Sequence, residues 1–114
     1  MTHYLISFPS SAMDHIAVED LPSVAESAHA VIREAKAAGI YVFGGGIDED
    51  VPPVLVSGNG IIQPGTYSET SRINGGFCVL KTVTRQEAEH WAAKIAAGCR
   101  CTQELRQFMY DPES

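Results

Sequence analysis

Two strand-helix-strand units, separated by a stretch rich in glycine and proline, constrain the fold of this chain more than any other feature. Short runs of aromatic and β-branched residues favour strands, and apolar residues that recur every three or four positions favour helices. This order predicts an α+β fold, the ferredoxin-like split βαβ repeat, in which two helices cover one face of an antiparallel sheet. The expected strands lie at 3–8, 40–43, 76–81 and 102–110, and the expected helices at 21–38 and 84–98.

The first helix carries several start and stop signals. Asp20 can cap it, Pro22 suits a first turn, and Ser23 and Glu26 have the spacing of a capping box. Gly39 is expected to end the helix. Its buried face would comprise Val24, Ala28, Val31, Ile32 and Ala35.

The second helix has the same kind of signals. Thr84 and Glu87 have capping-box spacing, and Gly98 is expected to end the helix. Its buried face would comprise Ala88, Trp91, Ala92 and Ile95. The final strand would be anchored by Leu105 and by Phe108 or Met109.

The middle of the chain predicts a hairpin. Apolar residues at 54–56 and 61–62 flank Ser57–Gly60, and Asn and Gly tolerate the positive φ angles of a tight turn. Before it, Gly44–Gly46 would allow a bend, a bulge or a close contact with a ligand.

Composition limits the class of protein. A chain of 114 residues that is 45% hydrophobic is expected to form one domain, over 1–114. A net charge of −6 argues against nucleic-acid partners and anionic membrane surfaces. No segment resembles a signal peptide or a membrane span, and the odd set of Cys78, Cys99 and Cys101 fits free thiols. We therefore expect a cytoplasmic protein.

Both faces of the central strands are apolar. Leu5 alternates with the apolar neighbours Tyr4 and Ile6, and residues 41–43 are apolar without interruption. Helices would cover one face only, so the other needs a cover. A second copy of the chain could supply it, because symmetric pairing buries the same patch twice. The sequence predicts a homodimer.

Residues 64–77 carry a family resemblance. The chain resembles the YCII-related family and its DGPF subgroup, whose members have an Asp-Gly-Pro-Phe turn, then a small residue, Glu, Thr, a polar spacer and Gly-Gly-Phe. Here Tyr67 stands at the Phe position, Ser68-Glu69-Thr70 follow, and Gly75-Gly76-Phe77 close the segment. Ala37-Ala38-Gly39 and the strand that ends at Gly44–Gly46 are similar too.

The chain departs from the family in the turn and in the residues of the first helix. Pro64 replaces the Asp of the turn. The His and Asp pair thought to act in YCII-like proteins has no match here, since His29 is about one position off and alanines precede Gly39. The resemblance implies a dimeric α/β barrel with a cleft. Family members are regarded as small-molecule enzymes or have no assigned activity, and some accompany extracytoplasmic-function sigma factors.

The candidate catalytic residues are His29 and Glu69, a carboxylate and an imidazole that suit proton abstraction if they meet. The alternatives are a surface histidine and a Glu69 that satisfies backbone donors in an irregular segment. The candidate substrate-binding residues are Tyr67, Thr70, Arg72 and His15.

No cofactor or metal is implied. Asp48-Glu49-Asp50 lacks EF-hand spacing, and Cys99-Arg100-Cys101 lacks a second ligand pair. The leading hypothesis is therefore a homodimer with a cleft for a small organic molecule and acid–base chemistry there. The alternatives are a non-enzymatic ligand-binding or accessory module in a regulatory system, and an oxygen-handling protein with an apolar cavity near Phe43, Phe77 and Trp91.

Overall fold

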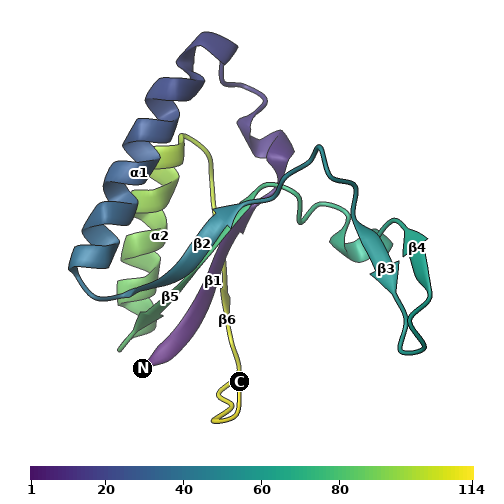
Figure 1. The fold of residues 1–114 in the computed structure, drawn as a ribbon. Coiled ribbons are helices and arrows are strands. Elements are labelled where there is room, and N and C mark those ends of the chain that lie inside the picture. Colours follow the sequence, from purple (N-terminus) through teal and green to yellow (C-terminus); the bar gives the residue numbers. More distant parts are fainter.

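A computed structural model describes residues 1–114. The chain contains six strands and two α-helices (Figure 1). In order, they are β1 (Thr2–Phe8), α1 (Leu21–Ala37), β2 (Tyr41–Gly46), β3 (Val54–Val56), β4 (Ile62–Pro64), β5 (Gly76–Thr82), α2 (Arg85–Cys99) and β6 (Glu104–Gln107). Three 3₁₀ turns lie in the connections, at Ser10–Met13, Val18–Asp20 and Ser68–Thr70.

The main sheet has the strand order β2-β5-β1-β6, and all neighbours are antiparallel. Strand β5 therefore lies between β1 and β2, and β1 lies between β5 and β6, so each strand-helix-strand unit is split by a strand of the other. Both helices cover the same face of this sheet (Figure 1). The predicted α+β class and the split order of the strands are confirmed.

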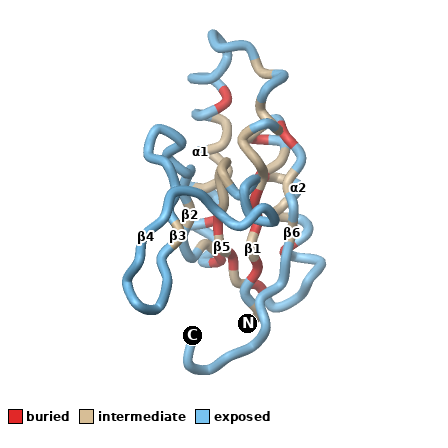
Figure 2. The backbone as a smooth tube through the Cα atoms, turned by 90° about the vertical axis from the view of Figure 1, so that its right-hand side faces the viewer, coloured by how far each residue is buried: buried red, intermediate tan, exposed pale blue.

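The core lies between the sheet and the helices. Alternate residues of β1 and β5 point into it, because side chains along a strand alternate between the two faces. In Figure 2 the buried residues gather along these strands and the facing helices. The central cluster comprises Ile6, Ala35, Ile40, Cys78, Leu80 and Ile95.

The start of α1 differs from the prediction. Asp20 precedes the helix but its side chain accepts no capping hydrogen bond, because Asp20 already belongs to a 3₁₀ turn in helical conformation. Glu26 does not close a capping box with Ser23 and pairs with Arg33 instead. The end is as predicted, since Gly39 has φ +75° directly after the helix.

The start of α2 is as predicted, and its end is not. The Thr84 hydroxyl accepts a hydrogen bond from the backbone N–H of Glu87 at 3.2 Å. The helix runs past Gly98 to Cys99, and Arg100 at φ 57° is the left-handed residue that ends it. Gly98 faces α1, where an added Cβ would lie 3.0 Å from the Ser27 carbonyl oxygen, so this glycine permits close helix packing.

The final strand is shorter than predicted. Leu105 pairs with Ile6 and packs against the core, which confirms that anchor. Strand β6 ends at Gln107, and Phe108 and Met109 lie in the exposed tail, with Met109 92% exposed. The backbone N–H of Phe108 still donates to the His3 carbonyl on β1 at 3.0 Å, but neither side chain belongs to the core cluster, so Leu105 is the apolar anchor of this strand.

The predicted hairpin is present, but it forms a separate two-stranded sheet outside the main one. Gly60 has φ +85° in its turn, as the sequence predicts. We call residues 51–66 the arm. It projects on the side of the main sheet opposite the helices (Figure 1).

The second face of the main sheet, here called the open face, has no helix over it. The register pairs Leu5 with Val79, and Phe43 also with Val79, which places these apolar side chains on that face. Phe43 is 63% exposed. None of the helices is long and apolar enough to span a membrane.

Candidate functional site

A pocket of about 300 Å³ opens between the open face and the segment that follows the arm. We call it the polar pocket. Its residues come from three distant parts of the chain, so that only the folded sheet assembles it. They are Ser7, Phe8, Pro9, Glu69, Arg72, Ile73, Gly75, Gly76, Phe77, Glu104 and Arg106.

Strand register builds the floor of this pocket. Ser7 on β1 lies opposite Phe77 on β5 and opposite Glu104 on β6, so all of these side chains share the open face. The Arg106 guanidinium is 3.4 Å from a Glu104 carboxylate oxygen and 3.5 Å from the Ser7 hydroxyl. The floor therefore carries a row of polar groups, and the Phe77 side chain lines the same pocket.

The segment 68–75 forms the opposite wall. The backbone N–H of Ile73 donates to the Thr70 carbonyl at 3.0 Å, and the Asn74 side chain accepts from the Ser10 N–H at 3.0 Å. Gly75 passes so close to β1 that an added Cβ would lie 2.2 Å from the Phe8 carbonyl oxygen. This contact holds the segment against the end of β1 and requires a glycine.

Glu69 and Arg72 are the charged groups on this wall. The Ser68 hydroxyl donates to the Glu69 carboxylate, and this hydrogen bond lowers the pKa of Glu69 below its ordinary value. Glu69 is therefore ionised at neutral pH, and its carboxylate oxygens can accept hydrogen bonds. Arg72 lines the same pocket and forms no ion pair with any carboxylate of the chain.

The structure brings together Glu69 and Arg72, two of the residues that the sequence singled out. Tyr67 and Thr70 are exposed and do not line the polar pocket. The Thr70 hydroxyl donates to the Tyr67 carbonyl at 3.3 Å, a local contact of the 3₁₀ turn. Both residues shape the turn that carries Glu69.

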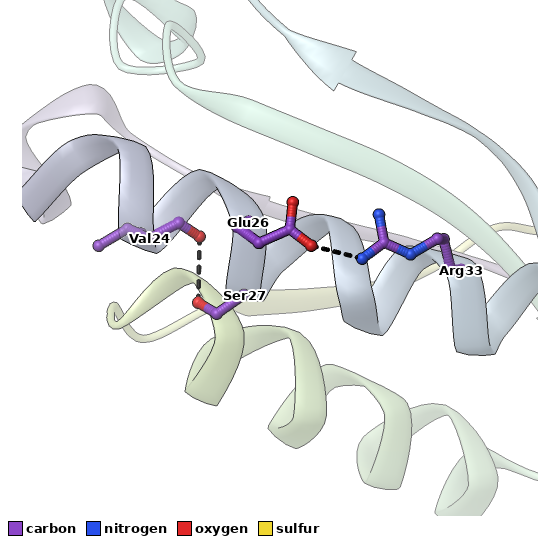
Figure 3. Close-up of polar contacts among 4 residues, drawn as sticks. All are labelled: Val24, Glu26, Ser27 and Arg33. Atoms are coloured by element: carbon purple, nitrogen blue, oxygen red, sulfur yellow. Dashed lines mark hydrogen bonds and ion pairs between the residues drawn. The ribbon is translucent and has the colours of Figure 1, made fainter.

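His29 lies elsewhere. It is exposed on α1, does not line the polar pocket and forms no hydrogen bond with Glu69. The charges that flank it bind each other, since Arg33 donates to Glu26 at 2.6 Å (Figure 3). This contact is the main cause that lowers the pKa of Glu26. Within one chain, His29 and Glu69 therefore do not form a pair.

His15 has a structural contact. Its Nε2 atom is 2.8 Å from the carbonyl oxygen of Arg100, the residue that ends α2. This hydrogen bond ties the loop after β1 to the second helix. His15 is not among the residues of the polar pocket.

Sequence reasoning missed Ser7, Glu104 and Arg106. A signal was present: Ser7 is the polar residue between Ile6 and Phe8, and Glu104 and Arg106 flank Leu105 with strand alternation. The local sequence pattern does not predict the register that places β6 beside β1. The same geometry separates the aromatic residues of the oxygen-handling hypothesis, since Phe77 lines the polar pocket whereas Trp91 packs against the core from α2.

The thiols are shielded. Burial raises the pKa of Cys78 to about 12 and the pKa of Cys99 to about 11, and it also raises the pKa of Cys101. Such thiols are poor nucleophiles at neutral pH. No group of three or more His, Cys, Asp or Glu side chains is placed to hold a metal ion.

No model of a known protein family matches the chain, and no curated protein matches it in sequence. Among solved structures, it is similar to 5-chloro-2-hydroxyhydroquinone dehydrochlorinase (TftG) from Burkholderia phenoliruptrix AC1100, determined in complex with 2,5-dihydroxybenzoquinone. The TM-score is 0.51 at 10% identity, over 99% of this chain and 98% of that chain. At this identity the likeness shows a shared fold alone, one that agrees with the fold implied by the YCII resemblance.

Proposed function

We propose that this protein is a YCII-like homodimer of the DGPF subgroup that binds a small organic molecule in the polar pocket. Arg72 is the observation that carries the proposal. A guanidinium without an acidic partner faces a concave site in a chain of net charge −6, and Arg presents donors in a fork that suits ligand oxygens.

The neighbouring groups specify the kind of ligand. Glu69 offers an acceptor for a ligand hydroxyl, Arg72 offers donors to a carbonyl or an oxyanion, and the Phe77 ring offers an apolar surface. A pocket of about 300 Å³ is at the small end of ligand sites. A single ring that carries hydroxyl and carbonyl oxygens fits this combination, and 2,5-dihydroxybenzoquinone, the ligand of the solved neighbour, is such a ring.

Calorimetric titration of 2,5-dihydroxybenzoquinone tests the binding. We expect saturable binding to the wild type and at least about tenfold weaker binding to Arg72→Met, the loss of one charge-assisted contact. Arg85→Met, which removes an exposed guanidinium on α2, is the matched control and should bind as the wild type does. Equal affinities of the two variants would show that Arg72 takes no part.

Acid–base catalysis at this pocket is the finer proposal. The Glu69 carboxylate, which lines the polar pocket, would act as the base towards a ligand hydroxyl or a bound water. Turnover of lactones, esters and haloaromatic compounds should fall at least about a hundredfold in Glu69→Gln, as expected for removal of a general base. His29→Gln tests whether His29 and Glu69 act together. An equal loss of turnover in this variant would require His29 of a second copy to reach Glu69.

A non-enzymatic binding or accessory module in a regulatory system is the second candidate. It is favoured by the absence of a histidine from the residues that line the polar pocket. It predicts that the ring compound binds and is recovered unchanged, with Glu69→Gln altering affinity alone. Product formation that depends on Glu69 would reject it.

A further inference from the structure

The arm is an unusual part of this chain. From Val51 to Ser68 no residue is charged, although charged residues make up 19% of the whole sequence. Its aliphatic side chains are largely exposed, among them Val56 and Ile62, each 64% exposed. Uncharged, exposed aliphatic surface of this kind marks an interaction site.

The arm also lacks support within its own chain. Strands β3 and β4 pair only with each other, and an isolated two-stranded hairpin is at best marginally stable in water. None of its residues up to Thr66 lines the polar pocket of the same chain. The arm therefore needs a surface that its own chain does not provide.

The size of the uncovered surface fits a second copy of the chain. The accessible surface is 7880 Å², about 1,800 Å² more than the roughly 6,100 Å² expected for a compact chain of this mass. The radius of gyration is 15.6 Å, against about 13 Å expected for this length. An excess of about 1,800 Å² per chain is enough for a stable homodimer, whose interface buries roughly 800 Å² or more per partner.

We propose that the arm of each chain docks on the open face of a second copy and covers the polar pocket there. The arm is uncharged and apolar, and the open face presents apolar Leu5, Phe43 and Val79 beside the polar pocket. Both surfaces are without a partner and lie on the side of the sheet opposite the helices (Figure 1). Each pocket would then be lined by Arg72 and Glu69 of one chain and closed by the arm of the other. The inference rests on the homodimer of the proposed function, and it adds a contribution from the partner to each site.

Sedimentation velocity tests the docking. We expect a wild-type dimer and at least about tenfold weaker dimerisation of Ile62→Asp, which puts a charge on the apolar arm. Val83→Asp, at a site 68% exposed outside the arm, is the matched control and should dimerise as the wild type does. Val56→Asp repeats the test on the facing strand, and fluorescence of Trp91, the only tryptophan, reports an intact core. A monomeric wild type, or equal dimerisation of the arm variants and Val83→Asp, overturns the proposal.

Mixed dimers test which chain closes the pocket. An isotope-labelled Ile62→Asp chain is paired with an unlabelled wild-type chain, and arginines are modified with phenylglyoxal and read by mass spectrometry. If the partner's arm covers the pocket, Arg72 of the labelled chain should be modified at least about fivefold more slowly than Arg72 of the unlabelled chain. This ratio corresponds to a difference of about 1 kcal/mol in protection. The unlabelled Arg72 should react, because the arm facing it is defective, and Arg85 should react equally in both chains.

Slower modification of Arg72 in the unlabelled chain, or equal modification of the two Arg72 residues, would overturn the proposal that the partner's arm covers the pocket. The assay needs no ligand. A chain that binds no ring compound can still show the protection, and a chain that binds one can still fail to show it, so the two proposals fail separately.

Discussion

Gly44 on β2 lies directly opposite Cys78 on β5, and a Cβ added to Gly44 would be 2.6 Å from the Cβ of Cys78. The same Cβ would be 2.6 Å from the Tyr41 hydroxyl. The pairing of β2 with β5 has a register shift between Tyr41 and Phe43, just before this glycine. Gly44 is therefore the glycine of the triple that close packing within the sheet requires, whereas a Cβ at Gly45 or Gly46 would meet nothing within 4 Å.

Gly44→Ala should lower the free energy of unfolding by about 1–3 kcal/mol, the usual cost of forcing extra volume into a packed site. Gly45→Ala is the matched control, because its Cβ would meet nothing within 4 Å. Urea denaturation of both variants checks this. Equal stabilities of the two alanine variants would contradict the close packing at Gly44.

The caps of the two helices make a second pair. Thr84→Ala should cost about 1 kcal/mol of stability, because it removes the acceptor for the Glu87 N–H. Asp20→Ala should change stability by much less, since the Asp20 side chain caps nothing. Thermal denaturation at neutral pH compares the two, and a larger loss for Asp20→Ala would show that the caps are assigned to the wrong residues.

Ser27 joins the helices. Its hydroxyl donates to the carbonyl oxygen of Gly98 on α2. The same hydroxyl lies 3.1 Å from the carbonyl oxygen of Val24, one turn earlier on α1 (Figure 3). Ser27→Ala should destabilise by about 1 kcal/mol, because the Gly98 carbonyl loses a donor at the helix contact. Ser11→Ala, which removes an exposed hydroxyl, serves as the control, and a Ser27→Ala protein as stable as this control would deny the hydroxyl a role.

The buried thiols predict a loss of stability at alkaline pH. The pKa of Cys78 is raised from 9.0 to about 12 in the folded chain, so between these values the unfolded state releases a proton that the folded state keeps. The stabilisation is complete below about pH 9 and is lost as the pH rises, with a slope of at most about 1.4 kcal/mol per pH unit for one thiol. Urea denaturation between pH 8 and 11 should show a shallower decline for Cys78→Ala than for the wild type. Parallel curves would mean that Cys78 does not titrate differently in the two states.

The sequence-based predictions that the structure confirms depend on residues close together in the chain. Thr84 and Gly39 act through neighbours a few residues away, and Leu5 and Ile6 alternate as a strand requires. Gly98 was misread as a helix end because its role depends on Ser27, which is distant in sequence. The sequence predicts the part of the polar pocket that comes from one segment, namely Glu69 and Arg72. It does not predict Ser7 and Arg106, which join them only through the sheet register.

His29 illustrates the limit of reasoning from residue type. An imidazole and a carboxylate suit proton transfer wherever they meet, but α1 lies on one face of the sheet and the polar pocket opens on the other (Figure 1). Which face a helix covers follows from the handedness and order of the connections and from no single residue.

The strand order has a consequence for the continuity of the backbone. Because β5 is inserted between β1 and β2, and β1 between β5 and β6, neither half of the chain can complete a sheet from its own strands. A cut in the exposed turn at Ser57–Gly60 would leave one fragment with β1 and β2 and another with β5 and β6. The strands of the two fragments alternate in the main sheet. Such fragments should each be unstructured when separate and recover the native sheet when mixed, which would make the protein a split reporter for events that bring two polypeptides together.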